Sequence, residues 1–403
     1  MSHIVIIGCG VVGAAIAYEL SLVPGLKITV VDKQPPAQGA TGAALGVLMG
    51  IISHKTKGKA WRMRQFSIQR YETLIPELEA LTGRKIPFNR QGILMLCSEG
   101  ENLTEWEKLA KTRSSQGWKL EIWDTAQLKV NCPQLNCQEM AAAIYSPQDR
   151  QVDPVALTLA MVDAARSNGV TFHFGVTIEG YDLNSTLQNQ PLKIKTTNAA
   201  KIDQLPLLEN VDWLVLAAGL GSSQFQLSNQ AWATPQSANN VSLNSLSVTE
   251  NCPQLHTETK QIISIKPVLG QAIHIKLSCP LGNPNFQPVI TGDDVHIVPV
   301  SGGEYWVGAT VEFPTDQEIG EPAKLEAVMA KATAFCPALA AATVIKTWSG
   351  LRPRPENRPA PIIERLQGSN ILLATGHYRN GVLLAPATAD AIRQMIMSSS
   401  IEF

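Results

Sequence analysis

Short apolar runs alternate with glycine turns and helix-like stretches at the start of this chain. Residues 4–7 and 27–31 form two mostly apolar runs, and the stretch AAIAYELS lies between them. Apolar runs of this length are typical of strands that are buried on both faces of a parallel sheet. The N-terminus therefore predicts a strand, a turn, a helix and a second strand.

The turn after the first run has the sequence Gly8-Cys9-Gly10-Val11-Val12-Gly13, and the second run ends at Asp32. Glycines in such a turn let the backbone approach a pyrophosphate, and the following helix N-terminus binds phosphate. An acid about 20 residues further on binds the ribose hydroxyls. The arrangement predicts dinucleotide binding, and the alternative is a glycine-rich turn that only packs a helix.

The parallel-sheet pattern returns later in the chain, with strands expected at residues 170–174, 192–196 and 213–217. Between these parts, residues 262–313 have the pattern of antiparallel strands, with a hairpin turn at Ser301-Gly302-Gly303. The alternation predicts an α/β fold with two domains, each built from segments that are not contiguous in the sequence.

We expect the first domain to be Rossmann-like and to consist of residues 1–85, 141–223 and 340–403. The second, an α+β substrate domain on a largely antiparallel sheet, would consist of residues 86–140 and 261–339. Residues 224–260 are rich in Asn, Gln, Ser and Thr, which predicts a polar surface insertion. A cleft between two such domains is a favoured place for a ligand.

Near the C-terminus, Gly350-Leu351-Arg352-Pro353 is followed by ATGHYRNGVLLAPATA over residues 374–389. A strand over 371–375 is expected to stop at Gly376, and a helix to begin at Gly381 after a polar turn. A helix N-terminus offers unpaired N–H groups and a partial positive charge. The pattern therefore predicts an anionic group beside this turn.

Composition excludes several classes of protein. The 403 residues carry 33 Lys and Arg against 34 Asp and Glu, so no basic surplus indicates a nucleic-acid partner. We expect no membrane-spanning segment and no signal peptide. The seven cysteines lack paired spacing, which favours free thiols in the cytoplasm over disulfides or a metal site.

These motifs resemble those of the D-amino-acid oxidase superfamily of flavoproteins, and most closely the bacterial glycine oxidases of thiamine biosynthesis. The segment HYRNGVLLAPATA is the most specific element, and GLRP, VGAT and GCGVVG support it. The resemblance covers nearly the whole chain. It implies non-covalently bound FAD, a small amino-acid substrate, O2 as the electron acceptor, and the possibility of a homo-oligomer.

The resemblance also implies a set of site residues. Arg352 would pair with the substrate carboxylate, Arg379 would be a second arginine near the substrate, and His296 and Tyr378 would complete the substrate site. No side chain is assigned as a catalytic acid, base or nucleophile, because positioning and the flavin do most of the work. The residues expected at FAD are Gly8, Gly10, Val11, Val12, Gly13, Asp32, Lys33, Ala40, Thr41, Leu45, Gly46, Val47, Val176, Gly219, Gly350, His377, Tyr378, Arg379, Asn380, Gly381, Val382 and Leu383.

The chain departs from its relatives at the substrate. His296 stands where they commonly have a tyrosine, and Val311 where they often have a methionine. An unperturbed imidazole titrates near pH 6.5, so substrate affinity is expected to weaken as the pH rises through that value. His296 could equally be a structural residue of its strand.

The expected activity is the FAD-dependent oxidation of glycine, sarcosine or a small D-amino acid to the imine, with release of H2O2. One alternative is a dehydrogenase that passes electrons to a quinone or a carrier protein. Another is a flavin-binding module without turnover.

Overall fold

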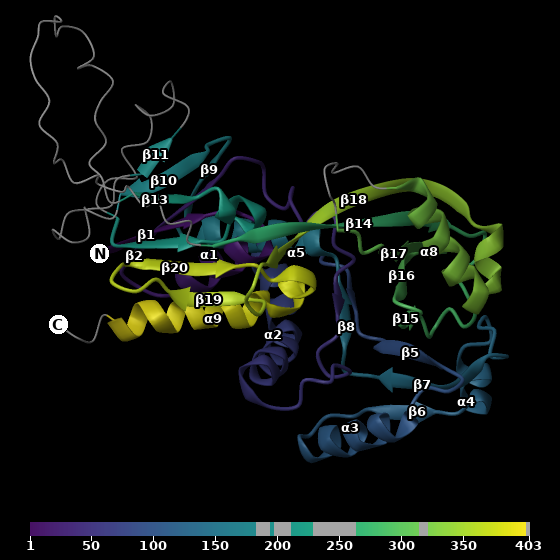
Figure 1. The fold of residues 1–403 in the computed structure, drawn as a ribbon. Helices are drawn as coiled ribbons and strands as arrows, with labels where there is room; N and C mark the ends of the chain where they lie inside the picture. Colours follow the sequence, from purple (N-terminus) through teal and green to yellow (C-terminus); the bar gives the residue numbers. More distant parts are fainter. Residues whose placement is uncertain (183–193, 197–210, 229–262, 314–320, 400–403) are drawn as a thin grey trace, which may run out of the picture.

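The computed structural model describes residues 1–182, 194–196, 211–228, 263–313 and 321–399. Its two largest sheets, of six and eight strands, lie at opposite ends of the molecule (Figure 1). The long strands β14 (Ile265–Lys276) and β18 (Thr343–Pro355) belong to the eight-stranded sheet and extend toward the other.

The first sheet has six strands in the order β19-β20-β12-β1-β2-β9. Its five neighbouring strands from β20 to β9 are parallel, and β19 pairs antiparallel at the edge. The bounds are β1 Ser2–Ile7, β2 Leu26–Asp32, β9 Thr171–Phe174, β12 Trp213–Leu216, β19 Ile362–Arg365 and β20 Ile371–Thr375. The predicted strand–turn–helix–strand unit at the N-terminus is confirmed.

Four helices cover one face of this sheet: α1 (Val11–Ser21), α2 (Gly58–Thr82), α5 (Pro154–Ser167) and α9 (Gly381–Ser399). Strand residues such as Ile4 and Ile6 point toward them, whereas Val5 and Ile7 point to the opposite face. That face packs on Ile263 and on residues near a small sheet of β10 (Ile178–Asp182), β11 (Ile194–Thr196) and β13 (Gln226–Ser228). Burial on both faces explains why the strands are continuous apolar runs.

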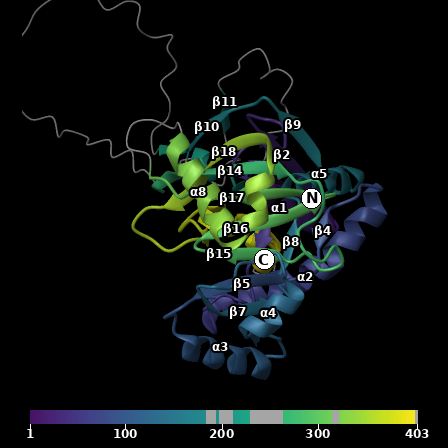
Figure 2. The same cartoon turned by 90° about the vertical axis from the view of Figure 1, so that its right-hand side faces the viewer.

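The second sheet has eight strands in the order β18-β14-β17-β16-β15-β5-β7-β6. The remaining bounds are β5 Ile93–Ser98, β6 Glu121–Trp123, β7 Met140–Ser146, β15 Val289–Gly292, β16 Val295–Ser301 and β17 Glu304–Gly308. One face packs on α4 (Thr125–Asn131), α8 (Pro322–Phe335) and η4 (Pro337–Ala341). The helix α3 (Leu103–Ser115) lies beside β6 and β7 (Figure 2).

The two sheets draw on the segments that the sequence predicted for the two domains, with two differences. Strands β7 and β18 belong to the second sheet, although the boundaries at residues 141 and 340 placed them in the first domain. β18 pairs with β14 over its whole length, a long-range pairing that local pattern does not reveal. Of the predicted insertion 224–260, residues 226–228 form β13, and residues 229–260 lie outside the described residues.

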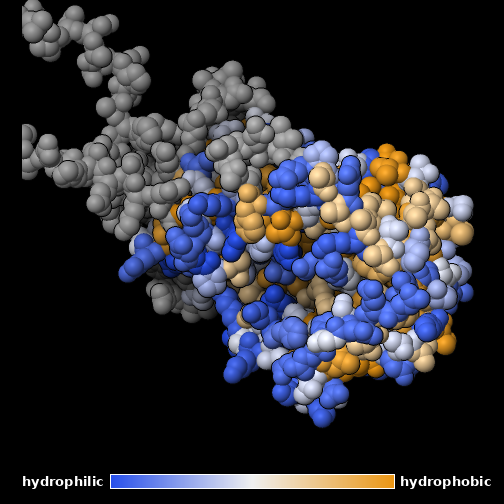
Figure 3. Space-filling view, turned by 45° about the vertical axis from the view of Figure 1, so that its right-hand side comes forward, coloured by the Kyte–Doolittle hydropathy of each residue, from blue (hydrophilic) through white to orange (hydrophobic). Residues whose placement is uncertain are grey.

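Three short strands connect the sheets: β3 (Val47–Leu48), β4 (Phe88–Asn89) and β8 (Arg150–Val152). Among the described helices, none is sufficiently long and apolar to cross a bilayer. On the face drawn in Figure 3, hydrophilic and hydrophobic residues are interspersed.

Candidate functional site

The glycine turn after β1 has a shape that only glycine permits. Gly8 has a φ of 104°, and a Cβ on it would lie 2.5 Å from the carbonyl oxygen of Ala217. A Cβ on Gly13 would lie 1.9 Å from the carbonyl oxygen of Gly8. The turn therefore holds the start of α1 tightly against β1 and the end of β12.

The N-terminus of α1 lacks a side-chain cap. Its N-cap residue is Gly10, so most of the first N–H groups have no partner from a capping side chain. The N–H of Val11 donates to Thr41 Oγ1 at 3.0 Å. Because the hydroxyl oxygen accepts this bond, its own proton is free to point outward, toward an anion at the helix terminus.

Asp32 lies at the carboxyl end of β2, next to this turn. Its Oδ2 accepts the N–H of Cys9 at 2.6 Å, and its Oδ1 accepts the N–H of Gln34 at 2.8 Å. A carboxylate has about four lone-pair sites, so two remain for hydroxyl donors. The N–H of Val176 donates to the Asp32 carbonyl at 3.1 Å, so two predicted cofactor residues are adjacent.

The carboxyl ends of β12 and β20 complete this edge of the sheet. Gly219 begins η2 (Gly219–Ser223), and its carbonyl accepts the Thr375 hydroxyl at 3.2 Å. After β20 the chain forms η5 (Tyr378–Asn380) and enters α9. In open α/β sheets, ligands bind outside the carboxyl ends of the strands.

The first turn of α9 is held by two residues of α2 that the sequence did not single out as site residues. Pro386 has no N–H, so it cannot donate to the carbonyl of Val382 four residues earlier. The buried Tyr71 hydroxyl donates to that carbonyl instead, at 2.5 Å. One residue further on, the N–H of Ala387 donates to Ser67 Oγ at 3.3 Å. The signal that could have found Tyr71 is the proline inside the predicted helix.

His377, predicted beside the flavin, turns its ring away from the open end of α9. Its Nε2 lies 2.9 Å from the hydroxyl of Thr388, which also donates to the Leu384 carbonyl. Burial lowers the pKa of His377 to about 4, so the imidazole is neutral. Its side chain holds the turn to the helix, and only its backbone is left for the predicted cofactor contact.

The second sheet turns one face toward the segment 43–47. Residues directly opposite each other in neighbouring strands share a face. Strand pairing therefore places Arg352, Trp348 and His296 on one face, together with the small residues Gly270, Ala272, Gly308 and Gly350.

The segment 43–47 lies close against this face. A Cβ on Gly350 would lie 2.2 Å from Ala43 Cβ, and one on Gly308 would lie 3.4 Å from Leu45 Cδ1. The indole N–H of Trp348 donates to the Ala43 carbonyl at 3.1 Å. The predicted FAD segment and the predicted substrate residues are thus brought together.

Arg352 is fixed by backbone rather than by a carboxylate. Its Nη1 donates to the carbonyls of Leu269 at 3.1 Å and Thr310 at 3.0 Å, and the guanidinium lies over Gly270. Within the described residues it forms no ion pair. Burial, and then the positive charge of Arg379, lower the pKa of Arg352 from its ordinary value, as expected for a cation that lacks its counter-ion.

His296 lies on the same face, with its Nδ1 2.9 Å from the hydroxyl of Thr291. Burial, followed by the charge of Arg379, lowers the pKa of His296 to about 4, and Arg352 acts in the same direction. The expected titration near pH 6.5 is therefore wrong, because burial and, after it, the neighbouring arginines disfavour the protonated imidazole. The structure does bring His296, Arg352 and Arg379 into electrostatic contact.

Tyr378 and Arg379 stand at the open side of this group. Tyr378 has a φ of 54°, a conformation that costs a non-glycine residue about 1–3 kcal/mol and that is found mostly at functional sites. Arg379 is exposed, and its guanidinium carbon lies 5.8 Å from the centre of the Tyr378 ring.

The family model described as FAD dependent oxidoreductase, DAO, matches residues 3–395. The chain belongs to the DAO family. It is 30% identical to the bifunctional protein ThiO/ThiG of Trichormus variabilis over 399 residues, which are 98% of this chain and 52% of that protein. It is 24% identical to a glycine oxidase of Geobacillus kaustophilus, over 100% of this chain and 96% of that one. The chain thus spans about half the length of the ThiO/ThiG relative.

A solved structure has the same fold. The glycine oxidase from Bacillus cereus superposes with a TM-score of 0.78 at 21% identity, covering 99% of this chain and 96% of that chain. The two-sheet DAO fold predicted from the sequence is therefore confirmed.

FAD, the cofactor of the DAO family, fits the residues that the structure presents. The uncapped start of α1 and the glycine turn suit its pyrophosphate, and Asp32 has lone pairs left for ribose hydroxyls. The first turn of α9 and the segment 43–47 would hold its ring system. When bound, FAD supplies a two-electron acceptor.

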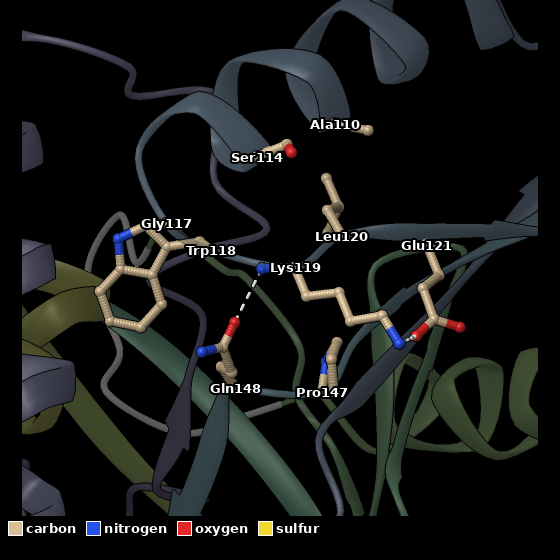
Figure 4. Close-up of a pocket in the computed structure, with 9 residues that line it drawn as sticks. All are labelled: Ala110, Ser114, Gly117, Trp118, Lys119, Leu120, Glu121, Pro147 and Gln148. Carbon is tan, nitrogen blue, oxygen red and sulfur yellow. Dashed lines mark hydrogen bonds and ion pairs between the residues drawn. The ribbon is translucent and has the colours of Figure 1, made fainter.

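A separate hollow of about 600 Å³ lies beside the end of α3, between residues 117–121 and residues 147–148 (Figure 4). It is lined by Trp118, Leu120 and seven other residues, none of which belongs to the DAO site described above. Its charged residues Lys119 and Glu121 pair with each other at 2.5 Å. The hollow therefore offers no unpaired charge to a ligand.

Proposed function

We propose that this chain oxidises a small amino acid to the imine and that O2 accepts the electrons, giving H2O2. The observation that carries the proposal is the guanidinium of Arg352, which is held by two backbone carbonyls and has no carboxylate partner among the described residues. A planar guanidinium binds a carboxylate through two parallel hydrogen bonds. An α-carboxylate is therefore the group expected there.

The other residues of the site are proposed to position the amino acid. Arg379 would contact the same carboxylate from the open side. Gly270 leaves room for the Arg352 guanidinium to lie flat over its strand, so the outer side of that guanidinium would face the substrate. The free N–H groups at the start of α9 would stabilise negative charge that develops during the oxidation.

An anaerobic titration tests the proposal. Glycine, sarcosine or D-alanine added to the purified flavoprotein should bleach the visible flavin absorbance, and admission of air should restore it with release of peroxide. Bleaching without release of peroxide would indicate an amino-acid dehydrogenase, which passes its electrons to an acceptor other than O2. Absence of bleaching by any amino acid would refute the proposal.

A further inference from the structure

Two guanidinium groups lie near the Tyr378 ring at the open side of the site, and a third, that of Arg352, interacts with Tyr378 electrostatically. The guanidinium carbon of Arg354 lies 5.6 Å from the centre of the Tyr378 ring, and that of Arg379 lies 5.8 Å from it. Arg352 interacts electrostatically with both Tyr378 and Arg379. Arg354 is the one member of the group to which the proposed function assigns no role.

None of these three arginines forms an ion pair with a carboxylate in the part of the chain that the structure describes. The charge of the buried Glu312 acts on Arg352 and opposes the lowering of its pKa, but the Glu312 carboxylate is bonded to Thr310 and Gln271 and lies 3.8 Å from the ammonium of Lys324. By contrast, Arg358, four residues beyond Arg354, pairs with Glu364 at 2.6 Å. Among the described residues, the three arginines of the site therefore differ from Arg358 in having no paired carboxylate.

A zwitterionic amino acid would not balance this charge. Its carboxylate can engage Arg352 and Arg379, but its own ammonium adds a positive charge beside them. Burial, and after it the charge of Arg379, already lower the pKa values of Arg352 and His296. The phosphates of FAD are expected at the start of α1, whereas the arginines are on β18 and η5, so the cofactor does not supply the missing anion.

The position of Arg354 indicates where a second anion would lie. Arg354 follows Arg352 by two residues on β18, so both side chains leave the same face of the strand. Arg352 is partly buried and Arg354 is exposed, with its guanidinium carbon also 5.4 Å from the ring of Phe313. One carboxylate can thus bind on the inner side, at Arg352, and another further out, at Arg354.

We infer that the substrate is an amino acid, or an N-substituted glycine, with a second carboxylate, and that Arg354 is the specificity-determining residue that binds it. The inference rests on the proposed function, because it deepens the choice of substrate at the same site.

Matched substrate pairs test it. D-Aspartate is compared with D-alanine, and iminodiacetate with sarcosine, by kcat/KM of the holoenzyme. We expect the dicarboxylate of each pair to be the better substrate. Arg354→Gln should lower the ratio of dicarboxylate to monocarboxylate about 10- to 100-fold, as for the loss of a charge-assisted hydrogen bond. The matched control, Arg358→Gln, removes an arginine that already has its partner and should leave the ratio unchanged.

A binding measurement separates this inference from the proposed function. Succinate and propionate are not amino acids, and their dissociation constants can be measured from the perturbed flavin spectrum without turnover. Succinate should bind more tightly than propionate, and Arg354→Gln should remove the difference while FAD content stays normal.

The outcomes are distinguishable. If no amino acid bleaches the flavin, the proposed function fails, and the succinate result still decides whether Arg354 binds a second carboxylate. If D-alanine and sarcosine bleach the flavin but the dicarboxylates are no better, or if Arg354→Gln affects both members of each pair equally, the inference is overturned.

Discussion

His377 and His296 each place an imidazole nitrogen 2.9 Å from a threonine hydroxyl, that of Thr388 and that of Thr291. Both have a pKa lowered to about 4. The causes differ, because burial alone acts on His377, whereas burial, Arg379 and Arg352 act on His296. Equal pKa values thus arise in two different environments.

The two regions also differ in what completes them. Around His377, the hydroxyls of Tyr71 and Thr388 satisfy carbonyls of α9 from within the protein. Around His296, Glu312 and Asp294 act on the group electrostatically, but among the described residues neither Arg352 nor Arg379 forms an ion pair with a carboxylate. The first region should therefore respond to mutation as part of the fold, and the second as part of a ligand site.

The largest expected effect is on the ligand side. Arg352→Lys keeps the positive charge but loses the two parallel hydrogen bonds of a guanidinium. We expect kcat/KM for the amino acid to fall by tens to thousands of fold, which corresponds to a loss of about 2–5 kcal/mol of transition-state stabilisation. FAD content should stay normal, because Arg352 faces the substrate. Steady-state kinetics and the flavin-to-protein ratio measure the two effects.

Arg358→Lys is the matched control for that substitution, since Arg358 pairs with Glu364 on the surface. It should leave kcat/KM unchanged. A normal kcat/KM in Arg352→Lys would show that the carboxylate is held elsewhere. The region around His296 would then not be the ligand site.

The next effect is the acid sensitivity of the fold. The folded pKa of His377, about 4, is below its ordinary value of 6.5, so the unfolded chain binds the proton more tightly. The contribution of His377 to the free energy of unfolding is therefore complete above about pH 6.5 and decreases as the pH falls toward 4, by up to about 3 kcal/mol. Urea unfolding of the wild type and of His377→Gln at about pH 7 and pH 5 measures the difference.

A carboxylate ligand should change the pKa of His296 but not that of His377. Propionate bound at Arg352 would offset the positive charges and raise the pKa of His296, while the pKa of His377 should not move. Titration of both imidazoles by NMR, with and without propionate, follows this directly. Equal shifts at both rings would contradict the assignment of the arginines to a ligand site.

The contrast also explains which features the sequence could predict. The glycine turn, Asp32 and the start of α9 depend on neighbouring residues, and the structure has them as predicted. The role of Tyr71 depends on a contact across 311 positions, so no local sequence pattern indicates it. The pairing of β18 with β14 and the lowered pKa of His296 are likewise set by distant residues, so local sequence patterns indicate neither.

Tyr71→Phe tests the region around His377. Because Pro386 has no N–H to donate, the Tyr71 hydroxyl is the hydrogen-bond donor to the buried Val382 carbonyl. Its removal should lower the free energy of unfolding by about 1–3 kcal/mol. FAD should also dissociate more readily, because Val382 begins the helix expected beside the ring. Urea unfolding and FAD dissociation are the measurements.

Tyr145→Phe is the control for that variant, because the Tyr145 hydroxyl donates to the Gln91 carbonyl at 3.1 Å in the other domain. Gln91 is only partly buried, so water can replace the bond and FAD retention should not change. Equal loss of FAD in both variants would show that Tyr71 has no particular role at α9.

The smallest expected effect compares the two threonines themselves. Thr291→Val removes one neutral hydrogen bond from His296, so the free energy of unfolding should fall by no more than about 1 kcal/mol. The ring would lose its fixed orientation, and kcat/KM should fall by less than about tenfold. Thr388→Val should lower the free energy of unfolding more, by about 1–3 kcal/mol, because the buried His377 nitrogen has no access to water. Similar destabilisation by both substitutions would mean that His296 is a structural residue like His377, and that the arginines alone define the ligand site.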